Sequence, residues 1–149
     1  MLRFCGSIAI ACPVSDVFAY VSDWRNPPRF LKALKRFEPV DPENAYGLGS
    51  RFAATVAVGP VNVDGEMEVI EFVPNERVVF HTRRGPKMRG TWDFRTEDGH
   101  TVVDLTNDFD SLPGGLVGRV VRTFIDQQAQ HELDASLEEL KRRLESGDL

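Results

Sequence analysis

The sequence contains few residues of the kinds that build disulfide frameworks, metal sites or membrane spans. Among its 149 residues are two cysteines and three histidines, and neither type recurs at the spacing of a zinc site. No apolar run approaches the roughly 20 residues needed to cross a bilayer, and the net charge of −5 argues against a surface that binds phosphates. We therefore expect no metal or other cofactor, no nucleic-acid partner and no transmembrane segment.

Both cysteines fall in or beside the first predicted strand. Cys5 and Cys12 are seven residues apart, which is about 23 Å in an extended chain and an odd separation that points them to opposite faces. They therefore cannot form a disulfide with each other. Two free thiols, in a chain whose start reads as a strand and not as a signal peptide, predict a cytoplasmic location.

Turn residues and hydrophobic periodicity predict one domain over residues 1–149, with a strand, two short helices, six further strands and a long helix. The strands are predicted at about 3–11, 34–40, 50–58, 61–73, 77–83, 88–97 and 100–110, and the helices at about 13–22, within 23–31 and at 116–144. A long helix with so few companions is most easily buried inside a curled sheet. We therefore predict an α+β fold in which a curved antiparallel sheet of about seven strands wraps around the C-terminal helix.

The hairpin around Asp98-Gly99 has the best-defined register, because this dipeptide favours a two-residue turn of type I′. The register sets Trp92 opposite Leu105 and Gly90 opposite Asn107, on a face that is otherwise apolar and aromatic. Asn107 is the polar exception on this inward face. We predict that its amide is satisfied by backbone groups or water, or alternatively that it orients a ligand.

The neighbouring hairpins extend the apolar face. A three-residue turn at 74–76 aligns Ile70 with Phe80. In the preceding hairpin, the alternation of inward and outward side chains would place Met67 and Val69 inward instead of Ile70 and Phe72. The strand at 61–73 therefore needs a β-bulge, which we predict at Gly65.

The first half of the long helix is apolar over a wide arc, which suits the wall of a cavity, whereas its second half has an ordinary buried stripe. We predict a mostly apolar cavity between this helix and the sheet. Its predicted lining is Phe52, Val56, Ile70, Phe72, Phe80, Trp92, Phe94, Leu105, Asn107, Phe109, Val121, Phe124 and Ile125. Glu68 and Thr82 are placed at the cavity edge, where a desolvated Glu68 would have acid or base potential. Exposure at the strand end is the simpler interpretation of Glu68.

Four positive residues lie within seven positions of this acidic chain: Arg83, Arg84, Lys87 and Arg89. The simpler interpretation is a solvated loop. The alternative is a positive rim near the cavity that receives an acidic head group or an acidic protein partner. We expect Arg84 and Lys87 to pair with no acidic residue.

Several motifs occur in an order that is typical of one superfamily. The chain opens with IAIACPVSDVFAYVSDWRNPPRFL, continues with GLGSRF, EVIEFVPNERVVFHT and GHTVVDLTNDFDS, and ends in the long helix. In this order it resembles the START/SRPBCC superfamily of polyketide cyclase and lipid-transport proteins. The resemblance covers nearly the whole chain and implies the helix-grip fold with two short helices after the first strand.

Three functions agree with these features. The first is binding or carriage of a small hydrophobic molecule, such as a lipid, polyketide or isoprenoid, in the cavity. The second is an aromatase/cyclase-type enzyme that uses the same cavity, and the third is a protein-interaction module that uses the basic 83–89 segment. We favour the first, because no convincing acid–base pair can be placed inside. The sequence predicts no oligomeric state.

Overall fold

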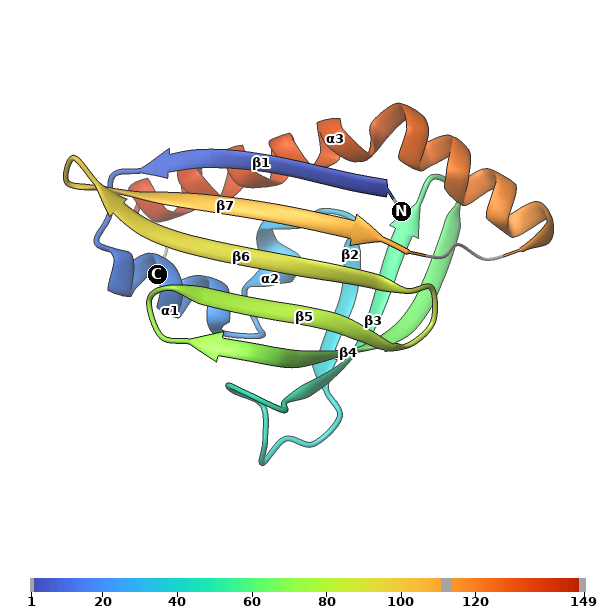
Figure 1. Ribbon diagram of the computed structural model, residues 1–149, viewed down its shortest axis with the longest axis horizontal. Coiled ribbons are helices and arrows are strands. Elements are labelled where there is room, and N and C mark those ends of the chain that lie inside the picture. The colour runs from blue at the N-terminus through green and yellow to red at the C-terminus, as the bar shows by residue number, and fades with distance from the viewer. Residues whose placement is uncertain (1, 111–113, 148–149) are drawn as a thin grey trace.

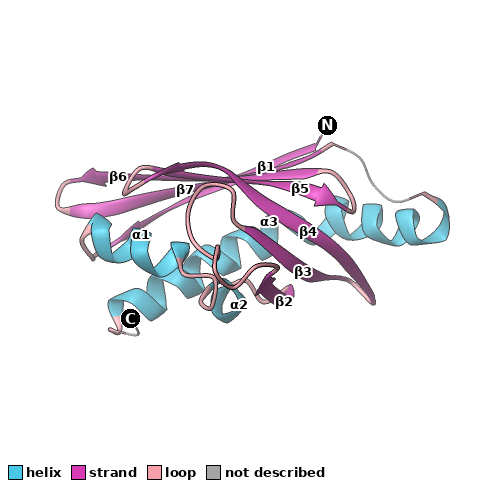
Figure 2. Cartoon of the chain, turned by 90° about the horizontal axis from the view of Figure 1, so that it is seen from below, coloured by secondary structure: helices cyan, strands magenta, loops and turns pink. Residues whose placement is uncertain are grey.

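The computed structural model describes residues 2–110 and 114–147. Seven strands form one antiparallel sheet in the order β1-β7-β6-β5-β4-β3-β2, and the helices lie on one side of it (Figures 1 and 2). The elements are β1 (Leu2–Ile10), α1 (Val14–Ser22), α2 (Pro27–Phe30), β2 (Leu34–Pro39), β3 (Arg51–Val58), β4 (Val61–Val73), β5 (Arg77–Arg84), β6 (Met88–Glu97), β7 (His100–Phe109) and α3 (Gly115–Glu145). The predicted fold is confirmed.

The hairpin between β6 and β7 has the predicted register. Asp98 and Gly99 both have positive φ angles, 51° and 77°, as a type I′ turn requires. Trp92 pairs with Leu105, and Gly90 pairs with Asn107. Because successive side chains of a strand point to opposite faces, this register places the apolar side chains of both strands on the side of α3.

The bulge in β4 was predicted at the wrong residue. Gly65 pairs regularly with Ala54, and the extra residue is Ile70, because Phe80 pairs with Val69. The predicted alignment of Ile70 with Phe80 is therefore wrong. Gly65 instead permits the close approach of β5, since a Cβ there would lie 2.7 Å from a backbone carbonyl oxygen.

Inward-facing residues of five strands form rows across the sheet, and we name three rows after their β6 residue. The Trp92 row is Gly6, Leu105, Trp92, Val78 and Phe72. The Gly90 row is Phe4, Asn107, Gly90, Phe80 and Val69. The Met88 row is Leu2, Phe109, Met88, Thr82 and Met67.

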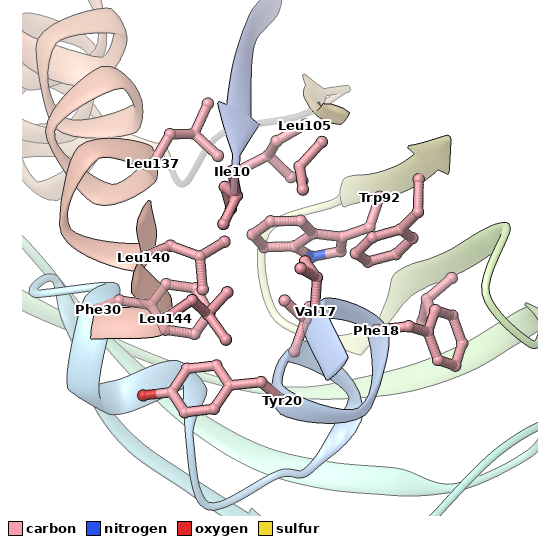
Figure 3. Packing of buried hydrophobic residues seen from close by; sticks show 14 of the residues in the cluster. Ile10, Val17, Phe18, Tyr20, Phe30, Trp92, Leu105, Leu137, Leu140 and Leu144 are labelled. Carbon is pink, nitrogen blue, oxygen red and sulfur yellow. The ribbon is translucent and has the colours of Figure 1, made fainter. Parts of the chain in front are cut away.

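The Trp92 row belongs to a closed hydrophobic core. Trp92 packs edge-on against Phe30 of α2, with ring centroids 6.1 Å apart, and Val17 of α1 is fully buried in the same cluster (Figure 3). The second half of α3 contributes Leu133, Leu137, Leu140 and Leu144. Burial of these side chains accounts for the docking of α1, α2 and the second half of α3 on the sheet.

α3 also covers the free edge of β1 (Figure 1). Lys141 donates a hydrogen bond to the carbonyl oxygen of Ala9, and the Ala11 N–H donates one to the carboxylate of Glu145, both at 2.9 Å. An uncovered edge strand is a template for pairing with another chain. These side chains therefore protect the sheet as well as holding the helix.

Neither cysteine forms a disulfide. Cys5 is exposed, and the Cys12 thiol donates a hydrogen bond to the carbonyl oxygen of Leu144 at 3.4 Å. Burial raises the pKa of Cys12, and the nearby Glu145 carboxylate raises it further. The cytoplasmic location drawn from the unpaired thiols stays a prediction. Within the described residues, no helix combines the length and apolar character that crossing a membrane requires.

Candidate functional site

The inner face of the sheet changes from closed to open along the strands. In the Trp92 row, Leu105, Trp92 and Val78 are buried, whereas all five side chains of the Met88 row are only half-buried. The Gly90 row lies between these rows and is mixed, with Phe80 and Asn107 half-buried. Inward-facing apolar residues that stay accessible mark the part of the interior that the core does not fill.

Gly90 lies at the centre of this less filled region. It is buried, yet among the described residues the Asn107 Oδ1 atom, at 3.4 Å, is the one non-adjacent atom within 4 Å of where a Cβ would stand. A Cβ on a packed inner face normally meets several neighbours. The missing side chain therefore leaves a space of at least methyl size on the inner face of the sheet.

Asn107 borders this space with an amide that has no partner among the residues that the structure describes. It lies between Phe4 of β1 and Gly90 of β6. Among the described residues, no group forms a hydrogen bond with its side chain, although it is half-buried. A sheltered amide usually has a partner from protein or water. The structure thus confirms that Asn107 points inward, with an amide that no described protein group engages.

Thr82 is the other polar residue of the Gly90 and Met88 rows, which we call together the two lower rows. Its side chain already has hydrogen-bond partners. Its hydroxyl accepts a hydrogen bond from the Met88 N–H at 3.1 Å and lies 3.2 Å from the Met88 carbonyl oxygen. These contacts join β5 to β6 where their regular ladder ends. Thr82 faces inward as predicted and has a structural role there.

The first half of α3 closes this region from the other side. Val121 and Ile125 are buried in a second hydrophobic cluster with Val58 of β3. Phe109 and Phe124 are partly buried against the same cluster. The buried residues of the second cluster are distinct from those of the closed core. The Gly90 and Met88 rows contact both, because Val69, Phe80 and Met67 belong to or pack against the core, Leu2 and Phe109 pack against the second cluster, and Phe4 packs against both.

The predicted lining residues fall into three groups. Those bordering the open region or the second cluster are Val56, Asn107, Phe109, Val121, Phe124 and Ile125. Those belonging to or packed against the closed core are Phe52, Phe72, Phe80, Trp92, Phe94 and Leu105, and Phe80 is also a member of the Gly90 row. Ile70 is the bulge residue and is placed in neither cluster.

The sequence analysis missed the residues that form the open region itself. Gly90, Met88, Met67 and Phe4 all occupy inward positions in the two lower rows. Gly90 carried a signal, because a glycine inside a strand indicates a bulge or the close approach of another group. Its pairing with Asn107 was recognised, but the space that it leaves was not.

Glu68 does not stand at the edge of the cavity. It lies between the inward-facing Met67 and Val69, so it points to the outer face. There its carboxylate lies 3.2 Å from the His81 imidazole. The predicted edge position is wrong for Glu68, and with it the potential for acid–base chemistry inside.

Two arginines of the basic segment share one buried carboxylate. The Glu66 side chain is 8% exposed and lies 3.1 Å from Arg84. Arg83 and Arg51 approach the same carboxylate at 3.6 and 3.7 Å. The expectation that Arg84 pairs with nothing is therefore wrong, and Lys87 is not free of partners either.

A shallow depression near the turn between β4 and β5 is a weaker candidate for a site. It is lined by Val73, Glu76, Arg77, Asp93, Phe94 and Arg95. Arg77 already pairs with Asp93 at 2.9 Å, and Arg95 pairs with Asp104. With Arg77, Asp93 and Arg95 engaged in ion pairs and four of its six lining residues charged, this depression lacks the largely apolar walls that the Gly90 region offers.

A curved antiparallel sheet that grips one long helix, with two short helices after the first strand, defines a helix-grip protein. Comparison with protein families gives the particular group. The chain belongs to the polyketide cyclase/dehydrase and lipid transport family, whose model matches residues 1–145. This match confirms the resemblance to the START/SRPBCC superfamily.

Solved structures with the same fold come from several bacteria. The Thermus thermophilus protein TTHA0849 is 20% identical, with a TM-score of 0.81 over 99% of this chain and 100% of its own. A START superfamily protein of Mycobacterium smegmatis is 14% identical, with a TM-score of 0.73 over 97% of each chain. The Zhui aromatase/cyclase of Streptomyces is 17% identical, with a TM-score of 0.69 over 96% of this chain and 95% of its own. Such identities support the fold alone, and among curated proteins none matches the sequence.

Proposed function

We propose that the protein binds a small hydrophobic molecule between the two lower rows of the sheet and the first half of α3. The observation that carries the proposal is the space over Gly90, a buried glycine with one neighbouring atom near its Cβ position. Half-buried apolar residues surround it, and the family includes lipid-transport proteins. Binding that removes about 300 Å² of apolar ligand surface from water would contribute about 7 kcal/mol before the costs of association.

A filling substitution tests this proposal. Gly90 does not have a positive φ angle, so a larger side chain can be accommodated there without backbone strain. We expect Gly90→Leu to occupy the space and to weaken binding of the neutral dye Nile red at least about tenfold. Native mass spectrometry of freshly purified wild-type protein would identify any bound small molecule, and the same molecule should be depleted in the variant.

Thr106→Val is the matched control. Thr106 neighbours Asn107 in β7 but points to the outer face, opposite Thr91. This variant should bind Nile red as wild type does, and both variants should unfold cooperatively. Undiminished dye binding by a folded Gly90→Leu protein would refute the location of the site.

The aromatase/cyclase alternative has less support from the site. In the Gly90 and Met88 rows the polar side chains are Asn107 and Thr82, and neither is an acid or base near neutral pH. General acid–base catalysis needs a group that gains and loses a proton. Binding therefore explains these rows better than proton transfer does.

The two alternatives that use the basic segment have less support than a neutral ligand. An acidic head group or acidic protein would have to compete with Glu66, which already pairs with Arg83 and Arg84. Exposed ion pairs contribute little, so this competition is not prohibitive. It does remove the reason for choosing an acidic ligand over a neutral one.

A further inference from the structure

We infer that Asn107 selects an uncharged ligand that carries one hydroxyl or carbonyl oxygen beside its apolar body. This inference rests on the proposed function and names the class of molecule that the site would take. It follows from two observations: the unused amide at the border of the space, and the distribution of charge around it.

The amide is placed to meet a ligand at the floor of the space. Its Oδ1 atom lies 3.4 Å from the position that a Gly90 Cβ would occupy, so it leans over the glycine. An amide offers both an acceptor and two donors, and it can therefore pair with a hydroxyl or with a carbonyl group. A purely hydrocarbon ligand would cover the amide and leave it unpaired, which is unfavourable.

No other group of the two lower rows competes for that role. The Thr82 hydroxyl is held by the backbone of Met88, and the remaining members of the rows are apolar or glycine. One polar contact is therefore available to a ligand at this position.

The charges of the neighbouring strands lie on the other face of the sheet. Arg89 adjoins Gly90 in β6 and points outward, opposite Asp108 of β7. Asp108 in turn accepts a hydrogen bond from Arg3 of β1 at 2.6 Å, and Arg83 and Arg84 approach Glu66. A ligand carboxylate inside would meet no cation in the Gly90 or Met88 row.

Burying an unpaired carboxylate is far less favourable than burying a hydroxyl that forms a hydrogen bond. The site should therefore discriminate between molecules of equal length that differ only in their end group. Decanol and methyl octyl ketone should bind more tightly than decane, and decanoate should bind most weakly.

Displacement of Nile red at about pH 8, where decanoate is ionised, tests this order. We expect decanol to displace the dye at a concentration at least about tenfold lower than decanoate does. In Asn107→Leu the preference of about tenfold for decanol over decane should be lost or reversed, because the hydroxyl would then be buried without a partner, while the affinity for decane should stay the same or rise. Thr106→Val should keep the wild-type order.

Two results would overturn the inference. One is decanoate binding to wild type as tightly as decanol does. The other is an equal loss of decanol and decane affinity in a folded Asn107→Leu protein, which would assign Asn107 a packing role only. If Asn107→Leu does not fold, the order of the four ligands on wild type decides the matter alone.

The experiment separates this inference from the proposed function. If neither the dye nor any of the four compounds binds wild type, or if Gly90→Leu binds the dye undiminished, the location of the site is wrong. If decane and the dye bind and Gly90→Leu excludes them, the site stands. The order of end groups then tests Asn107 alone.

Discussion

Two inward-facing glycines of neighbouring rows should respond in opposite ways to the same substitution. A Cβ added to Gly6 of β1 would lie 2.5 Å from the Leu133 Cδ2 atom and 3.0 Å from the Leu137 Cδ1 atom of α3. Both leucines are buried in the closed core, at 5% and 2% exposure, so they have little room to move. Overpacking of this kind costs about 1 to 3 kcal/mol, and we expect Gly6→Ala to destabilise the protein by that amount.

Gly90→Ala should not be destabilising. Its added Cβ would approach only the Asn107 Oδ1 atom among described non-adjacent residues, at an ordinary contact distance of 3.4 Å. Replacing glycine by alanine where the backbone conformation suits both restricts the unfolded chain and stabilises by about 0.4 to 1 kcal/mol. The two variants should therefore differ in free energy of unfolding by about 1.4 to 4 kcal/mol.

Urea denaturation of both variants measures this difference, with an equal m-value showing that the unfolding transition itself is unchanged. In thermal unfolding, a protein of this size should show a shift of about 3 °C in Tm for each kcal/mol. If Gly90→Ala lost as much stability as Gly6→Ala, the region over Gly90 would be as tightly packed as the closed core. The argument for a ligand space would then fail.

Two further predictions concern charges outside the ligand region. Glu66→Ala should lower the free energy of unfolding by about 1 to 2 kcal/mol in urea denaturation, because it leaves several arginines without their shared carboxylate. Arg84→Ala removes a side chain that is 76% exposed and should change stability by less than about 1 kcal/mol. Equal losses in the two variants would contradict the shared-carboxylate interpretation. The pKa of Glu145 lies below its ordinary value of 4.5, because of hydrogen bonds from Lys141 and from the Ala11 N–H, so the stability that it adds is complete above pH 4.5 and is lost as the pH falls through the lower folded-state pKa. The difference in free energy of unfolding between wild type and Glu145→Gln should therefore become smaller as the pH is lowered. A difference that stays constant from neutral to acid pH would refute this linkage.

Much of the fold was predictable because local signals agreed with one another. Asp98-Gly99 fixes a two-residue turn, and the alternation on both sides of it then fixes which residues face α3. The position of Asn107 on the inner face follows from that register alone. The sequence-based boundaries of the strands succeeded for the same reason, since each strand is bracketed by turn residues.

The bulge could not be located in this way. A bulge at either Gly65 or Ile70 would bring Phe72 to the inner face, and glycine is the usual residue at bulges. The choice is made by tertiary contacts: Gly65 is needed where the backbone of β5 approaches to 2.7 Å of its Cβ position. The extra residue falls at Ile70, where the register shifts between Val69 and Glu71.

The pairing of the basic segment was also beyond the sequence. Glu66 and Arg84 are 18 positions apart and meet because the β4–β5 register brings them opposite each other. A shift in this register, between Glu66 and Met67, lies at the same point. Charge density along the chain gives no information on such partners, which is why the segment resembled a free positive rim.

If the proposed function holds, the Trp92 row contributes mainly to stability and the Met88 row mainly to ligand binding. Side chains of the Trp92 row pack against α1, α2 and the second half of α3, and their loss leaves a cavity in a closed core. Side chains of the Met88 row are half-buried and face the first half of α3, where the second cluster is smaller. Substitutions in the first row should therefore act mainly on the free energy of unfolding, and substitutions in the second mainly on ligand affinity. Gly90 and Asn107 belong to the row between these two rows. The free energy of unfolding and the ligand affinity must therefore both be measured on the same variants for either to be interpreted.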